Sequence, residues 1–209
     1  MTCLEYLGAD APSRHRGGVS IFYRLEPHFV VVAVEKFGPN VIGFQLATRA
    51  RRWYIVGVYL APEDTTMMKR VSEALWSKPR GAELLVAGDF NVDLTSPEGD
   101  RRAEDIAMSL VTEGLEDMAR HFLPRENRWC WEWRTGGMIR KGREGRSRTD
   151  YILGTDRRLF RNVSIRYPRH NSDHYMVLSC LPSASLTEHN RYLGGRKKWP
   201  LRPPTKPTR

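Results

Sequence analysis

The chain has 209 residues, a formal net charge of +10 and a sequence pI near 9.8, and 40% of its residues are apolar. This length allows one domain with a substantial core and a tail, and it excludes an assembly of several large domains. The charge favours a polyanionic partner, foremost nucleic acid, although ribosomal and membrane-surface proteins share this bulk property.

The first part of the chain is rich in Val, Ile, Phe and Tyr, with short breaks at Gly, Pro and Asn. Such runs are typical of strands, and short breaks between them indicate antiparallel neighbours in a meander. We therefore predict four successive strands, at residues 18–24, 29–35, 41–48 and 53–60.

The apolar spacing then changes to that of a helix. Met68, Val71 and Leu75 recur at helical intervals. This pattern predicts an amphipathic helix over residues 63–77, on which these side chains form the buried stripe.

The rest of the chain alternates between strands and one more helix. The nearly all-apolar run 83–88 is typical of a strand buried on both faces, and a helix is expected at 100–113 with Asp100 as its N-cap. Strands covered by surface helices give an α/β layered domain over residues 1–182. Further strands are predicted at 129–133, 149–153, 163–167 and 175–180.

Two segments carry the basic character. Residues 134–148 hold six Lys or Arg and one Glu, and residues 185–209 hold seven Lys or Arg and one Glu, so the rest of the chain is close to neutral. The second segment also has clustered prolines and almost no apolar residues. We expect residues 183–209 to be a basic, Pro-rich, disordered linker or tail.

The three cysteines are odd in number, far apart and without metal-ligand spacing. Neither a disulfide framework nor a zinc site is indicated, which favours a reducing, intracellular compartment, and with nucleic acid as partner we expect a nuclear protein. No apolar run has the length of a membrane span, and the first residues lack the pattern of a signal peptide, so we expect no membrane partner.

Polar side chains stand at the ends of several predicted strands. Asp89 and Asn91 follow the buried run in "VAGDFNVD", and Asp150 opens the strand in "SRTDYIL". Each of these taken alone is also explained by the ordinary preference of Asp and Asn for turns. Because neighbouring strand ends share one edge of a sheet, we expect these side chains to lie around one cavity.

Two further strand ends add to this set. Asp173 and His174 precede the strand in "NSDHYMVLSC", and Tyr59 closes the strand in "GVYLAP". Carboxylate and amide oxygens favour Mg²⁺ or Mn²⁺ over zinc. Such an ion would neutralise a phosphodiester while an Asp orients or deprotonates a water and His174 donates a hydrogen bond to phosphate.

The motifs "GDFNVDL", "SRTDYIL" and "SDHYMVL", in this order and preceded by "GGVSIFYR" and "GVYLAP", resemble the endonuclease/exonuclease/phosphatase superfamily. Within it the sequence is most similar to the endonuclease domain of non-LTR retrotransposons, which resembles apurinic/apyrimidinic endonucleases. The resemblance covers residues 17–181. It implies a DNase I-like fold, which is a two-sheet α/β sandwich flanked by helices, and a cofactor of Mg²⁺ or Mn²⁺.

The resemblance also implies roles for three residues on the first two motif strands. Asp89 matches the catalytic aspartate that activates the attacking water and is expected to bind the metal ion. Asn91 matches the residue that orients this group and contacts phosphate. Tyr59 matches a tyrosine that contacts the scissile phosphate.

The last two motifs supply the remaining roles. Asp150 matches an aspartate near the metal side of the site, and His174 matches the histidine that stabilises the phosphorane-like transition state. Asp173 matches the aspartate that orients this histidine or binds the metal. The resemblance therefore gives Asp89 and Asp173 as expected metal ligands.

The N-terminal part departs from the family pattern. The family's domain opens with a strand ending in an Asn, a helix, and a strand ending in a Glu that is the main metal ligand. The residues before Gly17 leave no room for both elements, and we interpret Glu5 in "TCLE" as a solvated side chain. We therefore expect an N-terminally truncated domain with weak or absent metal-dependent nuclease activity.

The basic loop before the "DY" strand is expected to contact the DNA backbone, although a solvated surface loop would have the same composition. In a retrotransposon protein, the tail "KKWPLRPPTKP" would be the start of a linker toward a reverse transcriptase domain, and the alternative is a basic terminus without a specific role. The predicted nucleic-acid-binding residues are Arg140, Lys141, Arg143, Arg146 and Arg148.

The sequence thus predicts a metal-dependent DNA endonuclease of retrotransposon type. Two alternatives remain open. One is a catalytically silent remnant that binds nucleic acid, and the other is a phosphodiesterase of the same fold that acts on phosphoinositides or sphingolipids. The basic loop and tail and the lack of secretory features favour nucleic acid.

Overall fold

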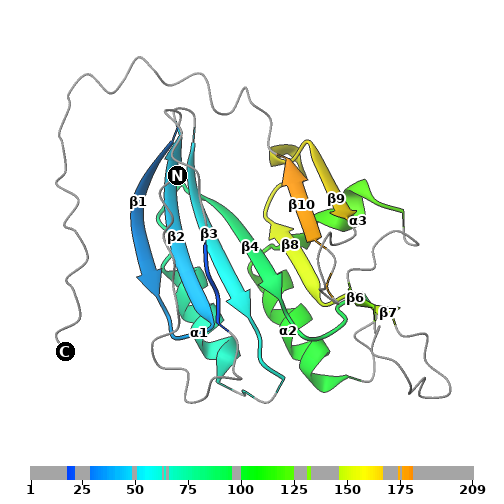
Figure 1. Cartoon of the computed structure of the whole chain (residues 1–209). Coiled ribbons are helices and arrows are strands. Elements are labelled where there is room, and N and C mark those ends of the chain that lie inside the picture. The colour runs from blue at the N-terminus through cyan, green and yellow to red at the C-terminus, as the bar shows by residue number, and fades with distance from the viewer. Residues whose placement is uncertain are drawn as a thin grey trace, which may run out of the picture.

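The computed structural model describes residues 18–21, 29–48, 51–62, 64, 66–95, 100–124, 131–132, 146–166, 174 and 176–180 (Figure 1). Its centre is a six-stranded sheet in the order β1-β2-β3-β4-β8-β5. All neighbours in this sheet are antiparallel except β3 and β4, which are parallel. The strands are β1 (Phe29–Lys36), β2 (Val41–Thr48), β3 (Arg52–Tyr59), β4 (Glu83–Asp89), β8 (Asp150–Gly154) and β5 (Glu116–Asp117).

Two longer helices cover one face of this sheet. Helix α1 (Met67–Trp76) connects the parallel strands β3 and β4, as a parallel pair requires, and α2 (Arg101–Thr112) follows β4. The predicted cap of α2 is confirmed, since the Asp100 side chain accepts hydrogen bonds from two backbone N–H groups of the first turn. The core on this face includes Val56, Val86 and Tyr151 of the sheet, with Val71 and Ile106 of the helices.

The opposite face packs against α3 (Met118–Phe122) and a second sheet of β9 (Asn162–Arg166) and β10 (Met176–Cys180). The core there includes Leu85 and Ile152 of the large sheet and Val163 of β9. Figure 1 shows β9, β10 and α3 together beside β8. The predicted two-sheet α/β sandwich with flanking helices is confirmed.

The remaining short elements are β6 (Trp131–Glu132), which pairs with β7 (Arg146–Ser147), and the 3₁₀ helix η2 (Arg157–Leu159). No helix in the described ranges is long and apolar enough to cross a bilayer. Residues 1–17 and 181–209 lie outside the described residues. They include Glu5 and the predicted tail, and the N-terminal truncation is also predicted in this region, so these expectations stay predictions.

Three differences from the predicted elements have physical causes. Residues 18–21 are not in a strand, although the Val19 side chain lies against Gly57 of β3, so its apolar character reflects packing on a sheet face. Helix α1 begins four residues later than predicted, because the Asp64 side chain accepts from the backbone N–H of Thr66 and holds a turn there. The short α3 was not predicted, since five residues carry too little periodicity.

The pairing of β3 with β4 depends on Gly88. Its φ is +148°, and a Cβ atom at this position would lie 1.8 Å from the backbone oxygen of Val58, its register partner on β3. A side chain there would push the two strands apart at the point where β4 reaches Asp89. Glycine is therefore required for both conformation and space.

Replacing Gly88 by Ala should weaken this pairing. We expect Gly88→Ala to lower the free energy of unfolding by about 2 kcal/mol or more, measured by urea denaturation. The control is Gly81→Ala, because Gly81 also has a positive φ of +76° but nothing lies within 4 Å of a Cβ there. Its expected loss is roughly 1 kcal/mol, and equal losses for the two variants would contradict the steric argument.

Candidate active site

Three of the predicted site residues are direct neighbours in the large sheet. Tyr59 of β3 pairs with Asp89 of β4, and Asp89 pairs with Asp150 of β8. Paired residues project from the same face of a sheet, and the alternation along β4 places Asp89 on the face of Leu85. This is the face covered by α3, β9 and β10. The register alone thus sets a phenol and two carboxylates side by side.

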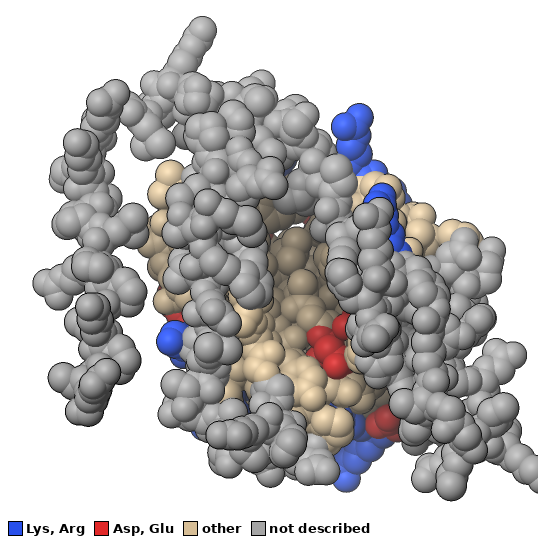
Figure 2. Space-filling model, viewed as in Figure 1, with Lys and Arg blue, Asp and Glu red and all other residues tan. Residues whose placement is uncertain are grey.

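His174, just before β10, completes a cluster with the two carboxylates. Its Nδ1 atom lies 2.7 Å from Oδ2 of Asp150, and one potential ligand atom each from Asp89, Asp150 and His174 lies within 4.8 Å of the others. The side chains of His174 and Asp150 are 34% and 20% exposed, so the cluster is open to a ligand. In the space-filling view, acidic side chains are visible within a hollow of the molecule (Figure 2).

Asn91 fixes the carboxylate of Asp89. Its backbone N–H donates to Oδ1 of Asp89 at 2.8 Å, and its side-chain Nδ2 donates to Oδ2 at 3.1 Å. Asn91 has a φ of 51°, a left-handed conformation that Asn adopts more readily than most residues. Both carboxylate oxygens are therefore held in a defined orientation by the same residue.

The surroundings raise the pKa of Asp89 above its ordinary value of 3.8. Burial is the largest cause, and the neighbouring Asp150 carboxylate acts in the same direction. The backbone N–H of Asn91, the charge of His174 and a hydrogen bond from Thr149 oppose this rise. Asp89 is thus a more basic carboxylate than one in water, which is a property required of a general base.

The donor set fits a hard divalent cation. Two carboxylates and an imidazole surround one point, and their negative charge would be compensated by the ion, which prefers carboxylate oxygens and retains water ligands. Because Nδ1 of His174 is engaged by Asp150, a contact of this imidazole with a substrate would be made through Nε2. The cluster is therefore suited to holding a cation and a phosphate at adjacent positions.

Several predicted site residues lie outside this cluster. Asp173, Arg140, Lys141 and Arg143 are outside the described residues, and Arg146 lies in β7. Their predicted roles stay predictions.

The prediction that Arg148 contacts nucleic acid is wrong. Its side chain is fully buried, and its guanidinium forms a bidentate ion pair with Asp117, with both distances below 2.8 Å. A buried and paired cation is not available to a phosphate. The sequence does not reveal that Arg148 is buried, because a core arginine and a surface arginine look alike within a basic segment.

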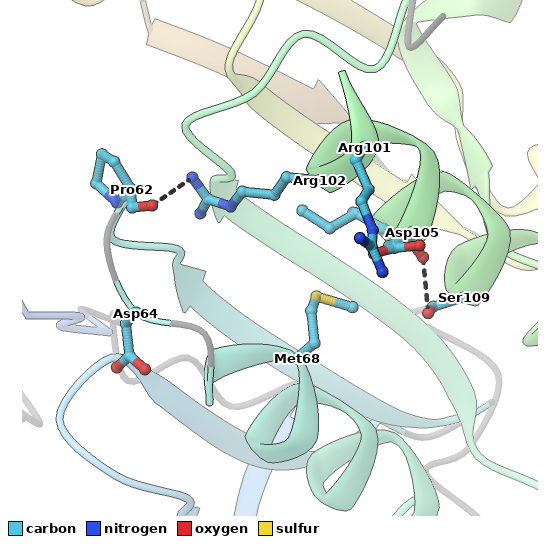
Figure 3. A pocket seen from close by; sticks show the side chains of 8 residues that line it. Pro62, Asp64, Met68, Arg101, Arg102, Asp105 and Ser109 are labelled. Atoms are coloured by element: carbon cyan, nitrogen blue, oxygen red, sulfur yellow. Dashed lines mark hydrogen bonds between the residues drawn. The ribbon is translucent and has the colours of Figure 1, made fainter. Parts of the chain in front are cut away.

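Arg102 was missed by the sequence reasoning. Its guanidinium donates to the backbone oxygens of Leu60 and Ala61 at 2.9 and 3.1 Å, and to that of Pro62 at 3.3 Å. These are the residues that follow Tyr59, so α2 holds the end of β3 in place. Figure 3 shows this side chain reaching from α2 to Pro62.

A cavity of about 420 Å³ lies between the starts of α1 and α2, beside Arg102 (Figure 3). It is on the helix-covered face of the sheet, opposite to Asp89, and its charged lining consists of two arginines and two aspartates. This balance favours neither a phosphate nor a cation. Its lining residues are Pro62, Asp64, Met68, Arg101, Arg102, Asp105, Ile106 and Ser109.

The raised pKa of Asp89 predicts a cost in stability. Because the folded protein binds this proton more tightly than the unfolded chain, the contribution of Asp89 falls as the pH rises from below 3.8 through its folded pKa. We expect metal-free Asp89→Asn to be more stable than the wild type at pH 7, with a smaller difference near pH 4. Urea denaturation in EDTA at both pH values measures this.

Asp156 provides a control of opposite sign. Hydrogen bonds from Arg158 lower the pKa of Asp156, so its stabilising contribution is present at neutral pH and is lost as the pH falls through its folded pKa. Asp156→Asn should therefore be less stable than the wild type at pH 7. A destabilised Asp89→Asn at pH 7 would contradict the electrostatic description of the cluster.

Known proteins share this fold. The endonuclease domain of TRAS1, a telomere-specific non-LTR retrotransposon, is 20% identical with a TM-score of 0.56, and the match covers 73% of this chain and 68% of that one. The 3′ phosphatase NExo from Neisseria, bound to a product DNA hairpin, is 18% identical with a TM-score of 0.54, covering 73% and 72%. At these identities the likeness shows the fold alone.

An endonuclease/exonuclease/phosphatase family protein from Leptotrichia buccalis C-1013-b is 15% identical, with a TM-score of 0.52 and coverage of 68% of this chain. The present chain spans about half of that protein, 53% of its length. No curated protein matches the sequence. The model of the Endonuclease/Exonuclease/phosphatase family matches residues 4–174, a range that contains Tyr59, Asp89, Asp150 and His174. The chain belongs to this family.

Proposed function

We propose that this chain is a divalent-metal-dependent DNA endonuclease of the retrotransposon type. The observation that carries the proposal is the half-buried cluster of Asp89, Asp150 and His174, in which the two carboxylates lie at the paired ends of β4 and β8. Two carboxylates beside an imidazole suit hydrolysis of a phosphodiester, because they combine a cation site, a base and a donor to phosphate. The net charge of +10 supports a polyanionic substrate.

Each residue of the site has a separate role in the proposed hydrolysis. Asp89, fixed by Asn91 and made more basic by burial, takes the proton of the attacking water. The water oxygen bonds to phosphorus as the ester P–O bond breaks, and the leaving oxygen takes a proton from solvent. His174 donates from Nε2 to the phosphate as negative charge develops there, and Asp150 holds the imidazole through Nδ1. Tyr59, in register with Asp89, contacts a non-bridging phosphate oxygen.

A bound Mg²⁺ or Mn²⁺ would neutralise phosphate charge, and Asp89 and Asp150 are the described residues that would hold it. Asp173, which is adjacent to His174 in the sequence, is proposed as a further ligand. The basic residues Arg140, Lys141, Arg143 and Arg146 are proposed to bind the DNA backbone. We also propose that the protein is nuclear and that the basic tail leads toward a reverse transcriptase domain.

Nicking of supercoiled plasmid in Mg²⁺ or Mn²⁺ tests this function. We expect Asp150→Asn and His174→Ala to lower the nicking rate by about 100-fold, with DNA affinity changed less than about tenfold, and EDTA to abolish the activity. The matched control is Asp105→Asn, which removes an exposed carboxylate of α2 on the other face of the sheet.

Three results would separate the alternatives. Salt-dependent DNA binding without any metal-dependent nicking would favour the silent nucleic-acid-binding remnant. Hydrolysis of a phosphoinositide in place of DNA would favour the lipid phosphodiesterase. Nicking that survives Asp150→Asn would exclude the cluster as the active site.

A further inference from the structure

A buried ion pair lies behind the catalytic edge. The guanidinium of Arg148 is 0% exposed and donates from Nη1 and Nη2 to the two carboxylate oxygens of Asp117, at 2.7 and 2.6 Å. The Asp117 side chain is only 9% exposed. The guanidinium also lies over the ring of Tyr151, with its central carbon 4.6 Å from the ring centroid. Two parallel charge-assisted bonds and a stacked ring fix both the position and the plane of the cation.

The same segment holds the loop that follows Asp89. The hydroxyl of Tyr151 accepts from the backbone N–H of Leu94 at 2.7 Å and donates to the backbone oxygen of Arg148 at 2.7 Å. Burial and the carboxylates of Asp93 and Asp117 raise the pKa of Tyr151, so its hydroxyl keeps the proton that it donates. The hydroxyl thereby links the loop to the backbone at Arg148.

Further contacts tie this loop to the start of β8 and to α3. The backbone N–H of Phe90 donates to the backbone oxygen of Thr149 at 2.8 Å, and that of Arg148 donates to Asp93. Arg120 of α3 donates to the backbone oxygen of Leu94 at 3.0 Å. Asp117 also caps α3 by accepting from the backbone N–H of Ala119. The ion pair joins the start of β8 to α3. Bonds from these two segments, made by the backbone at Arg148 and Thr149, by Tyr151 and by Arg120, hold the loop 90–95 against them.

The catalytic carboxylates are the direct neighbours of these bonded residues. Asp89 precedes Phe90, and Asp150 lies between Thr149 and Tyr151. We propose that Arg148 and Asp117 are positioning residues, which set the distance between the Asp89 and Asp150 carboxylates by holding the loop 90–95 against the start of β8. The proposal rests on the proposed function, because it concerns the geometry of the same cluster.

Because this pair is buried, its role in positioning can be distinguished from a general contribution to the stability of the fold. Buried ion pairs contribute little net stability compared with apolar side chains of the same volume, since both charges lose their hydration. Their geometry is nevertheless strict, and a bidentate fork cannot be reproduced by an ammonium group. Replacing Arg148 by Lys keeps the charge but loses the fork, so it should loosen the loop more than it destabilises the fold.

The test compares Arg148→Lys with Arg158→Lys. Arg158 forms a similar forked pair with Asp156, but its side chain is 86% exposed. Amide hydrogen exchange by NMR reports on the loop through Phe90 and Leu94, and on the whole fold through the amides of α2. Nicking kinetics in Mg²⁺ report on the cluster through kcat and KM.

We expect Arg148→Lys to speed exchange at Phe90 and Leu94 at least about tenfold while the α2 amides change less than about threefold. Its kcat should fall at least about tenfold with KM nearly unchanged, and Arg158→Lys should alter neither measurement. Unchanged exchange at Phe90 and Leu94, or an equal increase across α2, would overturn the proposal. Exchange requires no catalysis, so a wild type that does not nick DNA would count against the proposed function alone.

Discussion

The candidate site depends on the register of β4 between β3 and β8. This strand pairs in parallel with β3 and antiparallel with β8, and the two registers meet at Asp89. Because side chains alternate along a strand, a slip of one residue would turn Asp89 to the face covered by α1 and α2. Gly88 contributes to this register by letting β4 approach the backbone of Val58, a contact that no residue with a Cβ atom permits.

The central strands and the meeting of their polar ends could be predicted from the sequence, because both follow from local patterns. The buried run 83–88 and the carboxylates of Asp89 and Asp150 are adjacent to apolar residues whose period identifies a strand, and strand ends converge in any packed sheet. His174 was identified with them by the same reasoning, and the structure places it at the cluster. What could not be predicted was the distance between these groups.

Tertiary contacts decide what local patterns leave open. Arg148 belongs to the basic segment 134–148. It is the only charged residue of this segment whose side-chain surroundings the structure describes, and this side chain is buried in the core. Its partner Asp117 is 31 residues earlier, at the start of a helix too short to predict. Arg102 likewise bonds to carbonyl groups about 40 residues away. No pattern within a window of one helix or strand carries such information.

Two adjacent carboxylates require a rigid environment, because their mutual repulsion favours separation. Burial is the largest cause of the raised pKa of Asp89, and the Asp150 carboxylate acts in the same direction. The carboxylate of Asp89 is held by Asn91, and that of Asp150 by His174.

These local bonds fix the orientation of each carboxylate, but they do not hold the two strand ends together. The strand ends are held by the β4–β8 ladder, which reaches the pair of Asp89 and Asp150. The backbone bond from Phe90 to Thr149 and the hydroxyl of Tyr151 extend this connection to the loop 90–95. The rigidity of the candidate site thus depends partly on residues outside the cluster of Asp89, Asp150 and His174.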